Sequence, residues 1–197
     1  MTDRVASVLP IVSVGNPVLR ERARDVSPEE LRSPETQRFI DDMIATMRAA
    51  SGAGLAANQV GDLRRIAVVE VREGNPRYPY KPPIPLTVMV NPRLEPAGDE
   101  TVEINEGCLS VPDLRGDVDR CVTVRVRYLD RDGHERVDER RGLTAGTFQH
   151  EVDHLDGVLF VDRVRDPKSL TTWEQFERHH RDAFLARAAR LVERLGS

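Results

Sequence analysis

Two histidines four residues apart, with a glutamate beside the first, are the residues of this sequence best suited to chemistry. In the stretch HEVDH (residues 150–154), a helix would place His150 and His154 on one face, because residues four apart lie above one another. Neutral imidazoles bind borderline divalent metals, and the Glu151 carboxylate can act as a base on a nearby water. The pattern predicts a metal-dependent hydrolase and leaves the bond it cleaves open. The alternative is a solvated helix face whose histidines have no function.

A site of this kind needs a third protein ligand, and the two cysteines are the candidates. Cys108 follows a glycine in an irregular segment (residues 105–112), whereas Cys121 lies in an alternating strand pattern and is expected to face the core. Cys108 is therefore the better candidate, although a single cysteine is ordinarily a small buried hydrophobic residue. A disulfide between the two would close only a short loop, and free thiols suit a reducing compartment.

Length and composition describe a globular protein with a real core. Its 197 residues are 39% hydrophobic and 31% charged, which excludes a disordered chain. The net charge of −4 gives no general attraction to nucleic acid or anionic lipid, so we expect no membrane association and no direct DNA binding. Because Pro10 interrupts the apolar start of the chain, a signal peptide is not expected there. The expected location is cytoplasmic.

The predicted elements are those of an α+β fold, with antiparallel sheets around a central metal-binding helix, an N-terminal amphipathic helix and a long C-terminal helix. A serine followed by proline begins a helix at residues 27–31, and residues 34–50 carry an apolar stripe at helical spacing that indicates core. Gly157 is expected to end the metal-binding helix. The predicted strands are residues 65–71, 86–90 (stopped by Asn91 and Pro92), 100–104, 120–128 and 135–140.

Two loops and the last helix complete the chain. The small residues of GAGLAANQ (residues 52–59) would let backbone approach a ligand closely, and a tightly packed turn is the alternative. The proline-rich residues 73–85 predict a surface connection between strands. One helix is expected after Pro167, with an arginine face that is ordinarily only solvated. Its apolar face contains Trp173, Phe176, His180, Phe184, Ala188, Leu191 and Leu195, and its arginine face contains Arg187, Arg190 and Arg194.

Three segments together, GAGLAANQ (52–59), EGCLS (106–110) and HEVDH, resemble in order and separation the signature blocks of the peptide deformylases. The resemblance implies removal of the N-formyl group from the initiator methionine of nascent polypeptides, with release of formate. It implies that metal-bound hydroxide attacks the formyl carbon. It also implies a catalytic domain over residues 1–166, with the C-terminal helix (residues 167–197) packed on it.

The same resemblance assigns roles to residues around the metal. Cys108, His150 and His154 would hold the ion, which in the family is typically Fe²⁺, with Zn²⁺ or Ni²⁺ able to occupy the site. Glu151 would be the general base and acid. Gln59 and the backbone N–H of Leu109 would stabilise the oxyanion.

Further residues are assigned to substrate binding. Gly54 resembles the position whose backbone pairs with the peptide, and Ala53 and Gly107 belong to the same blocks. Arg115 resembles an arginine near the substrate entrance in some relatives. Many relatives carry larger apolar residues where this chain has Gly146 and Thr147, so the width of the methionine pocket stays open.

Two other functions remain as alternatives. A zinc endopeptidase with the HExxH pattern usually takes its third ligand from further along the chain, and the nearby Asp156 and Asp162 do not resemble that arrangement. A non-catalytic metal-binding or ribosome-binding module would lack Glu151 or Gln59, and both are present. Separately, the arginines of the last helix suggest contact with the ribosome.

Overall fold

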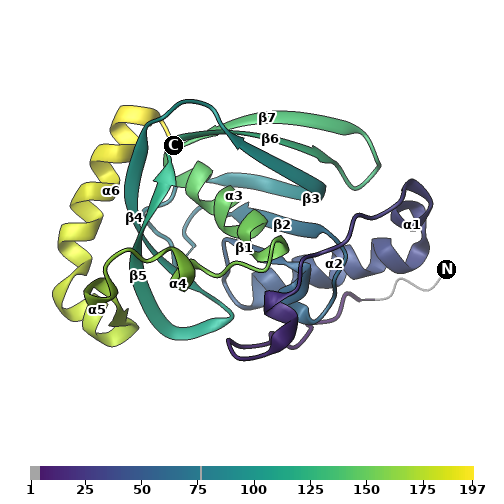
Figure 1. Ribbon diagram of the computed structural model, residues 1–197, viewed down its shortest axis with the longest axis horizontal. Helices are drawn as coiled ribbons and strands as arrows, with labels where there is room; N and C mark the ends of the chain where they lie inside the picture. The colour runs from purple at the N-terminus through teal and green to yellow at the C-terminus, as the bar shows by residue number, and fades with distance from the viewer. Residues whose placement is uncertain (1–4, 76) are drawn as a thin grey trace.

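The computed structural model describes residues 5–75 and 77–197, and Pro76 in the proline-rich loop lies outside them. A five-stranded sheet has the order β1-β2-β3-β6-β7, and a three-stranded sheet has the order β4-β5-β8. All strand pairs within these sheets are antiparallel. Figure 1 shows helix α3 at the centre, with α1 and α2 at one end of the molecule and α6 at the other. This is the predicted α+β fold.

The elements have the following bounds. The strands are β1 (Gly54–Ala56), β2 (Ile66–Val71), β3 (Ile84–Pro96), β4 (Thr101–Cys108), β5 (Val111–Cys121), β6 (Thr123–Leu129), β7 (Glu135–Arg141) and β8 (Thr171–Thr172). The α-helices are α1 (Pro28–Arg32), α2 (Pro34–Ala49), α3 (Gly142–Leu155), α4 (Phe160–Arg163), α5 (Trp173–His179) and α6 (Arg181–Leu195). Short 3-10 helices are η1 (Pro17–Arg20), η2 (Ala57–Val60) and η3 (Pro167–Ser169).

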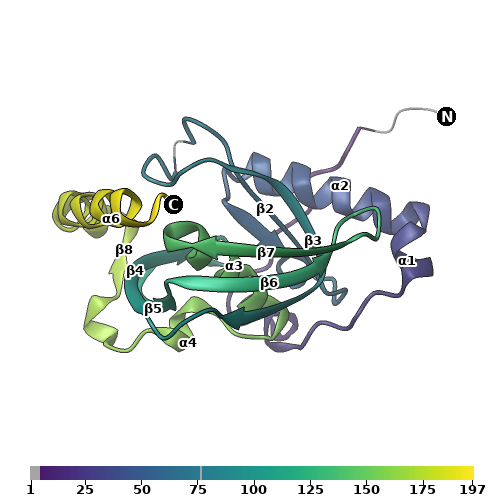
Figure 2. The same cartoon turned by 90° about the horizontal axis from the view of Figure 1, so that it is seen from above.

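Strand β2 is buried on both faces and separates two layers of the core. Ile66 and Val68 pack in a cluster with the apolar stripe of α2, whereas Ala67 and Val69 pack in a second cluster with α3. Successive side chains of a strand point to opposite faces, which explains why this strand is almost continuously apolar. The larger sheet is therefore covered by α2 on one face and by α3 on the other, as the view from above indicates (Figure 2).

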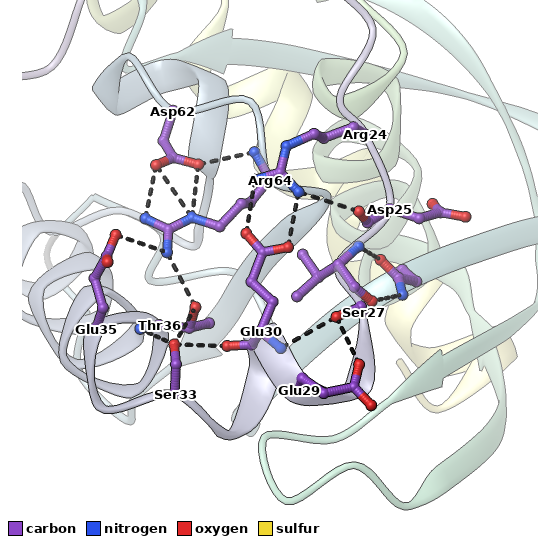
Figure 3. Close-up of polar contacts among 12 residues, drawn as sticks. Arg24, Asp25, Ser27, Glu29, Glu30, Ser33, Glu35, Thr36, Asp62 and Arg64 are labelled. Atoms are coloured by element: carbon purple, nitrogen blue, oxygen red, sulfur yellow. Dashed lines mark hydrogen bonds and ion pairs between the residues drawn. The ribbon is translucent and has the colours of Figure 1, made fainter.

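Polar contacts tie the N-terminal helices to the turn before β2 (Figure 3). The buried Arg64 pairs with Asp62 at 2.7 Å and donates a hydrogen bond to Thr36 at 3.1 Å. Arg24 makes two hydrogen bonds to Glu30, at 2.6 and 2.8 Å. These contacts link α1, α2 and the turn, and so orient the apolar face of α2 toward the sheet.

The predicted end of a strand at Asn91 and Pro92 is wrong, because β3 continues to Pro96. Asn91 has a positive φ of 53°, and the pairing with β6 shifts register between Val90 and Arg93. The Asn91 side chain accepts a hydrogen bond from the Val26 N–H and donates one to the Val26 carbonyl. A bulge tolerates proline because the missing N–H falls where the ladder is already interrupted.

The region around the two cysteines also differs from the prediction. The third strand, β4, runs to Cys108 and β5 begins at Val111, so both enter the segment predicted to be irregular (residues 105–112). The strand predicted at residues 120–128 is divided, because β5 ends at Cys121 and β6 begins at Thr123. Cys108 therefore ends a strand, at a register shift that follows Gly107. Cys121 ends β5, is half-buried, and packs against the core around α3. Both thiols are free, since the described cysteines form no disulfide.

The last segment is two helices rather than one. Helix α5 ends at His179 and α6 begins at Arg181, with His180 between them at φ −121° and ψ −20°. His180 is exposed, so its predicted place on the apolar face is wrong. The residues of these two helices that are buried in one apolar cluster, as predicted, are Phe176, Phe184, Ala188 and Leu191.

Within residues 5–75 and 77–197, no helix combines the length and apolar character that crossing a membrane requires.

Candidate metal centre and active site

Cys108, His150 and His154 lie together beside α3. Their ligand atoms all lie within 4.8 Å of one another, and the Cys108 Sγ is 3.2 Å from the His154 Nε2. Cys108 and His154 are buried, and His150 is half-buried. Burial lowers the pKa of His154 well below its usual value, so this ring is neutral and able to donate a lone pair. One thiolate and two imidazoles are a donor set that fits a divalent transition metal.

Helix α3 holds its two histidines rigidly because almost the whole helix is buried. Ala145 and Phe148 pack toward the larger sheet, and the helix ends after Leu155. Gly157 has a φ of +76°, and a Cβ there would lie 2.5 Å from the Arg20 carbonyl oxygen. Only glycine suits both this left-handed conformation and this close approach. The predicted role of Gly157 in ending the helix is confirmed in these terms.

A buried carboxylate orients His150. The His150 Nδ1 donates to Glu106 at 2.8 Å, and Glu106 receives two hydrogen bonds from Arg120, at 2.7 and 2.9 Å. Arg120 also pairs with Asp153, at 2.6 Å. Burial alone would raise the pKa of Glu106, but the charge and hydrogen bonds of Arg120 outweigh it and hold that pKa well below its usual value. Because the His150 Nδ1 donates to the ionised Glu106, Nε2 is the ring nitrogen that can bind a metal together with Cys108 and His154.

The Glu151 carboxyl is buried in the same site, and burial raises its pKa to about 7. Its Oε2 has no hydrogen-bond partner among the described residues. Gly54 makes room for it, since a Cβ at position 54 would lie 2.3 Å from Oε1. A carboxyl group with a pKa near neutrality can both take up and release a proton at physiological pH.

The side-chain amide of Gln59 points toward the cluster of Cys108, His150 and His154. Its Nε2 lies 3.5 Å from the Cys108 Sγ and 3.1 Å from the Ser110 Oγ, while its Oε1 accepts a hydrogen bond from the Ala56 N–H. The extended N-terminal segment contacts two parts of the site, because the Val12 N–H donates to the Gln59 carbonyl at 2.9 Å and the Val14 N–H donates to the Ser110 carbonyl at 2.6 Å. Gln59 is thus fixed with its donor end toward the metal ligands.

A pocket that is open to solvent lies against this cluster. Strand β1 lies at the edge of the larger sheet and β4 at the edge of the smaller one, and both contribute to the pocket wall. Ala53, Gly54, Gly107 and Leu109 all line it. Two open strand edges beside a reactive centre suit an extended peptide, which can pair with backbone groups.

The neighbouring strand β4 limits the width of the pocket beside the small residues of α3. Gly146 and Thr147 line the pocket, but a Cβ on Gly146 would lie 2.8 Å from the Ile104 Cδ1. The absence of a side chain at residue 146 therefore lets β4 approach α3 closely. It does not widen the pocket by the volume of the missing side chain.

The proline-rich loop is more than a surface connection. Tyr78 is buried, and Tyr78, Tyr80 and Lys81 all line the pocket. The Lys81 Nζ donates a hydrogen bond to the Thr147 Oγ1 at 2.7 Å. Loop composition indicated solvent exposure but carried no information on which residues fold inward.

Arg115 lies beneath α5 and is only 1% exposed. Its Nε donates to the Asn105 Oδ1 at 2.7 Å, and its guanidinium carbon lies 4.1 Å from the centre of the Trp173 ring and 4.4 Å from that of Phe176. Arg115 lines the pocket, so aromatic residues of the C-terminal segment hold one wall of the candidate site.

Comparison with known proteins finds, over most of the chain, the family that the three sequence segments resemble. A family described as polypeptide deformylase matches residues 8–170. The chain belongs to the peptide deformylase family. A relative from Nostoc sp., peptide deformylase 2, is 44% identical over 170 residues, covering 86% of this chain and 93% of the relative.

Two solved structures of peptide deformylases agree with the fold. The Met-Ala-Ser-bound class I type b enzyme from Acinetobacter baumannii has a TM-score of 0.77 and 42% identity, covering 81% of this chain and 99% of its own. The actinonin complex from Synechococcus elongatus has a TM-score of 0.72 and 32% identity, covering 95% of this chain and 86% of its own. The family is metal-dependent and acts on formylated nascent peptides, and its members are hydrolases.

Sequence reasoning missed several residues that the structure brings to or beside this candidate site. Glu106 lies two residues before Cys108 on one strand, so the period of two could have placed both side chains on the same face. Lys81, Tyr78 and Trp173 gave no such signal, because their positions depend on how a loop and a terminal helix pack. The third member of the ligand cluster is a cysteine that precedes the histidines, unlike the arrangement expected for the endopeptidase alternative.

Proposed function

We propose that this protein removes the formyl group from N-formylmethionyl peptides by metal-dependent hydrolysis. The observation that carries the proposal is the buried Glu151 carboxyl beside the cluster of Cys108, His150 and His154. The reaction consumes one water, breaks the bond between the formyl carbon and the peptide nitrogen, and yields formate and a free amine.

Cys108, His150 and His154 would hold the metal, and Glu106 would keep His150 in the tautomer that offers Nε2. The mixed thiolate and imidazole set supports Fe²⁺ as the native ion, with Zn²⁺ or Ni²⁺ able to occupy the site. When bound, the metal supplies Lewis acidity toward the formyl oxygen and the attacking water.

Glu151 is proposed to take a proton from the attacking water and to pass it to the departing nitrogen. Its elevated pKa favours this double role. The Gln59 Nε2 and the backbone N–H of Leu109 are proposed to donate to the oxygen that becomes negative in the transition state. Loss of one such donor typically lowers the rate about 100- to 1000-fold.

Gly54 and Ala53 at one open strand edge, and Gly107 at the other, are proposed to pair with the peptide backbone. Backbone pairing tolerates many sequences, which suits an enzyme acting on varied nascent chains. Arg115 is proposed to contact the peptide beyond its first residue, because its guanidinium lies at the pocket wall and is held by Asn105.

Formate release separates this function from internal proteolysis. Protein purified anaerobically, with its metal content measured on the same sample, is expected to release formate from formyl-Met-Ala-Ser and to leave an unformylated peptide intact. Glu151→Gln is expected to retain metal and lose nearly all formate release, because the amide cannot accept the proton. Internal cleavage without formate release would refute the proposed reaction, and near-normal turnover by Glu151→Gln would refute the role of Glu151.

We also propose that the C-terminal helix contacts the ribosome, in the cytoplasm where nascent chains are formed. Arg194 pairs with Glu100 at 2.7 Å, so Arg187 and Arg190 are the arginines with the greater freedom to contact RNA. Ribosome binding that is unchanged and insensitive to salt after replacement of Arg187, Arg190 and Arg194 would contradict the contact.

Residues 1–166 are proposed as the catalytic domain, with residues 167–197 packed on it.

A further inference from the structure

A second cavity adjoins the pocket of the candidate active site. The two spaces share Tyr80 and Arg115, and helices α5 and α6, at one end of the molecule in Figure 1, provide much of the second one's wall. We call this space the arginine–aromatic cavity after the wall residues Arg77, Tyr80, Arg115, Trp173, Phe176 and Phe184. The match to the polypeptide deformylase family ends at residue 170, so three of these four aromatic rings lie beyond it.

Two guanidinium groups of this cavity lie against one indole ring. The guanidinium carbon of Arg115 lies 4.1 Å from the centre of the Trp173 ring, and that of Arg77 lies 5.0 Å from the same centre. The attraction of each cation to the ring holds both arginines there, although their like charges repel each other. A third arginine in the wall, Arg181, pairs with Glu177 at 3.1 Å, so its charge is already balanced.

Within residues 5–75 and 77–197, neither Arg77 nor Arg115 forms an ion pair with a carboxylate. Arg115 is 1% exposed, and it donates to the side-chain and backbone oxygens of Asn105 at 2.7 and 3.1 Å, which are neutral acceptors. The Asn105 amide donates to Asp117 at 2.7 Å, and so stands between that carboxylate and Arg115. The buried Nε of Arg77 has no hydrogen-bond partner among the described residues. Buried charges are ordinarily paired, so these two guanidinium groups lack an anion.

We propose that the arginine–aromatic cavity binds an organic carboxylate, with the guanidinium groups of Arg77 and Arg115 on the carboxylate and the aromatic rings on its apolar part. A guanidinium presents its N–H groups in a planar fork that matches a carboxylate. The rings supply the apolar contact, since Tyr80 lies edge-on to Phe184 with 4.8 Å between the ring centres. A small inorganic anion would gain nothing from these rings, which favours a ligand that carries apolar surface as well as charge.

The carboxylate has two possible sources with the same chemistry. Because Tyr80 and Arg115 line both spaces, the ligand is either a free molecule or an acidic side chain of a peptide that extends from the active site. Binding of a free carboxylate requires no deformylation, so it can be measured independently of the proposed function. The acidic side chain is measured through turnover, and therefore rests on the proposed function.

Trp173 reports binding of a free carboxylate, because it is the only tryptophan of the chain and lies in the cavity wall. Phenylacetate and its uncharged counterpart phenylacetamide are titrated into the metal-loaded full-length protein while tryptophan fluorescence is recorded. Phenylacetate is expected to bind roughly tenfold more tightly or better, the usual effect of hydrogen bonds to a charged group.

Matched variants relate this binding to the cavity. Arg77→Gln removes one guanidinium and is expected to weaken phenylacetate binding roughly tenfold while leaving phenylacetamide binding unchanged. Arg72→Gln makes the same substitution at an exposed arginine that pairs with Glu70, and is expected to leave both affinities unchanged. Arg77→Lys keeps the charge without the planar fork, and is expected to have an intermediate affinity for phenylacetate.

Formyl-Met peptide amides with Asp or Asn at the second, third or fourth residue test the peptide as the source. If the bound peptide supplies the carboxylate, kcat/KM for the Asp peptide is expected to exceed that for its Asn counterpart roughly tenfold at one of these positions. Arg77→Gln is expected to remove that difference, and Arg72→Gln to retain it. Equal values at all three positions, with phenylacetate bound, would assign the cavity to a free molecule.

The outcomes separate this inference from the proposed function. Phenylacetate that binds no more tightly than phenylacetamide, together with equal kcat/KM values for every Asp and Asn pair, would overturn the inference and leave the proposed function standing. A preference for the charged ligand that Arg77→Gln does not reduce would also overturn it. Absence of formate release from all the peptides would overturn the proposed function, and the fluorescence titrations would still decide whether the cavity binds a carboxylate.

Discussion

Gly54→Ala tests whether the carboxyl of Glu151 has the position that catalysis requires. The added Cβ would lie 2.3 Å from Oε1 and 2.5 Å from Cδ, against an ordinary contact of 3.4 Å or more. The carboxyl group must therefore move by about 1 Å, since the backbone of Gly54 is paired with Val69 in the sheet. A misplacement of about 1 Å can lower a rate roughly 100-fold, equivalent to about 2.7 kcal/mol of activation free energy.

The assay is kcat for formate release from formyl-Met-Ala-Ser, with metal content and thermal stability measured on the same samples. We expect kcat to fall about 100-fold while metal content stays at the parent level. The glycine has no left-handed φ, so alanine adds no backbone strain and folding should be retained. An unchanged kcat in a folded, metal-loaded Gly54→Ala protein would refute the reasoning.

A double mutant distinguishes the carboxyl from the peptide-binding edge. If Gly54→Ala acts by displacing the Glu151 side chain, adding it to Glu151→Gln should lower kcat little further, because the displaced group is already inactive. Effects of residues that act through one another are not additive. A full additional 100-fold loss in the double mutant would show that the methyl group acts elsewhere, for example on peptide pairing at β1.

Three other perturbations follow from buried or stacked contacts. Glu106→Gln leaves its arginine partner, which is 2% exposed, with Asp153 as its remaining charge partner, so it should lower the free energy of unfolding by about 1–3 kcal/mol. An unchanged denaturant midpoint would contradict this. The hydrogen bond from Arg48 holds the pKa of Glu70 below its usual value, so their ion pair stabilises the protein above about pH 4.5 and loses that effect as the pH falls. Arg48→Met should therefore lower the free energy of unfolding at pH 7 but not at pH 2, which unfolding curves recorded at the two pH values would reveal. Trp173→Leu removes the ring stacked on the buried pocket arginine and should raise KM roughly tenfold with kcat retained, whereas Trp173→Phe should keep KM near the parent value.

The buried ion pairs around α3 indicate how stability and function are combined here. Arg120 joins Glu106 on β4 to Asp153 on α3, and Asp153 also pairs with Arg163 at 2.5 Å. Buried ion pairs often add little net stability compared with apolar packing, because both charges lose water. These ion pairs have a geometric role, since they fix the Glu106 carboxylate that accepts a hydrogen bond from the His150 Nδ1. We expect their loss to affect metal affinity as well as folding.

Several features of the protein were determined by local sequence. The spacing of His150 and His154 determines that a helix presents both rings on one face, and Gly157 ends that helix because only glycine fits its turn. The apolar stripe of α2 and its serine and proline start were predicted for the same reason. Such features depend on residues a few positions apart, whose relation is set by the geometry of one turn or one strand.

Where pairing or packing joins distant segments, only the tertiary structure decided the outcome. The bulge at Asn91 depends on the Val26 backbone, and the two helices that meet at His180 pack on one apolar cluster through Phe176 and Phe184. Lys81 and Thr147 are 66 residues apart, and no periodic pattern relates them. The inward-facing lysine and the space that Gly54 leaves for the catalytic carboxyl arise from the meeting of separate elements, because side-chain contact depends on their relative placement and not on their order along the chain.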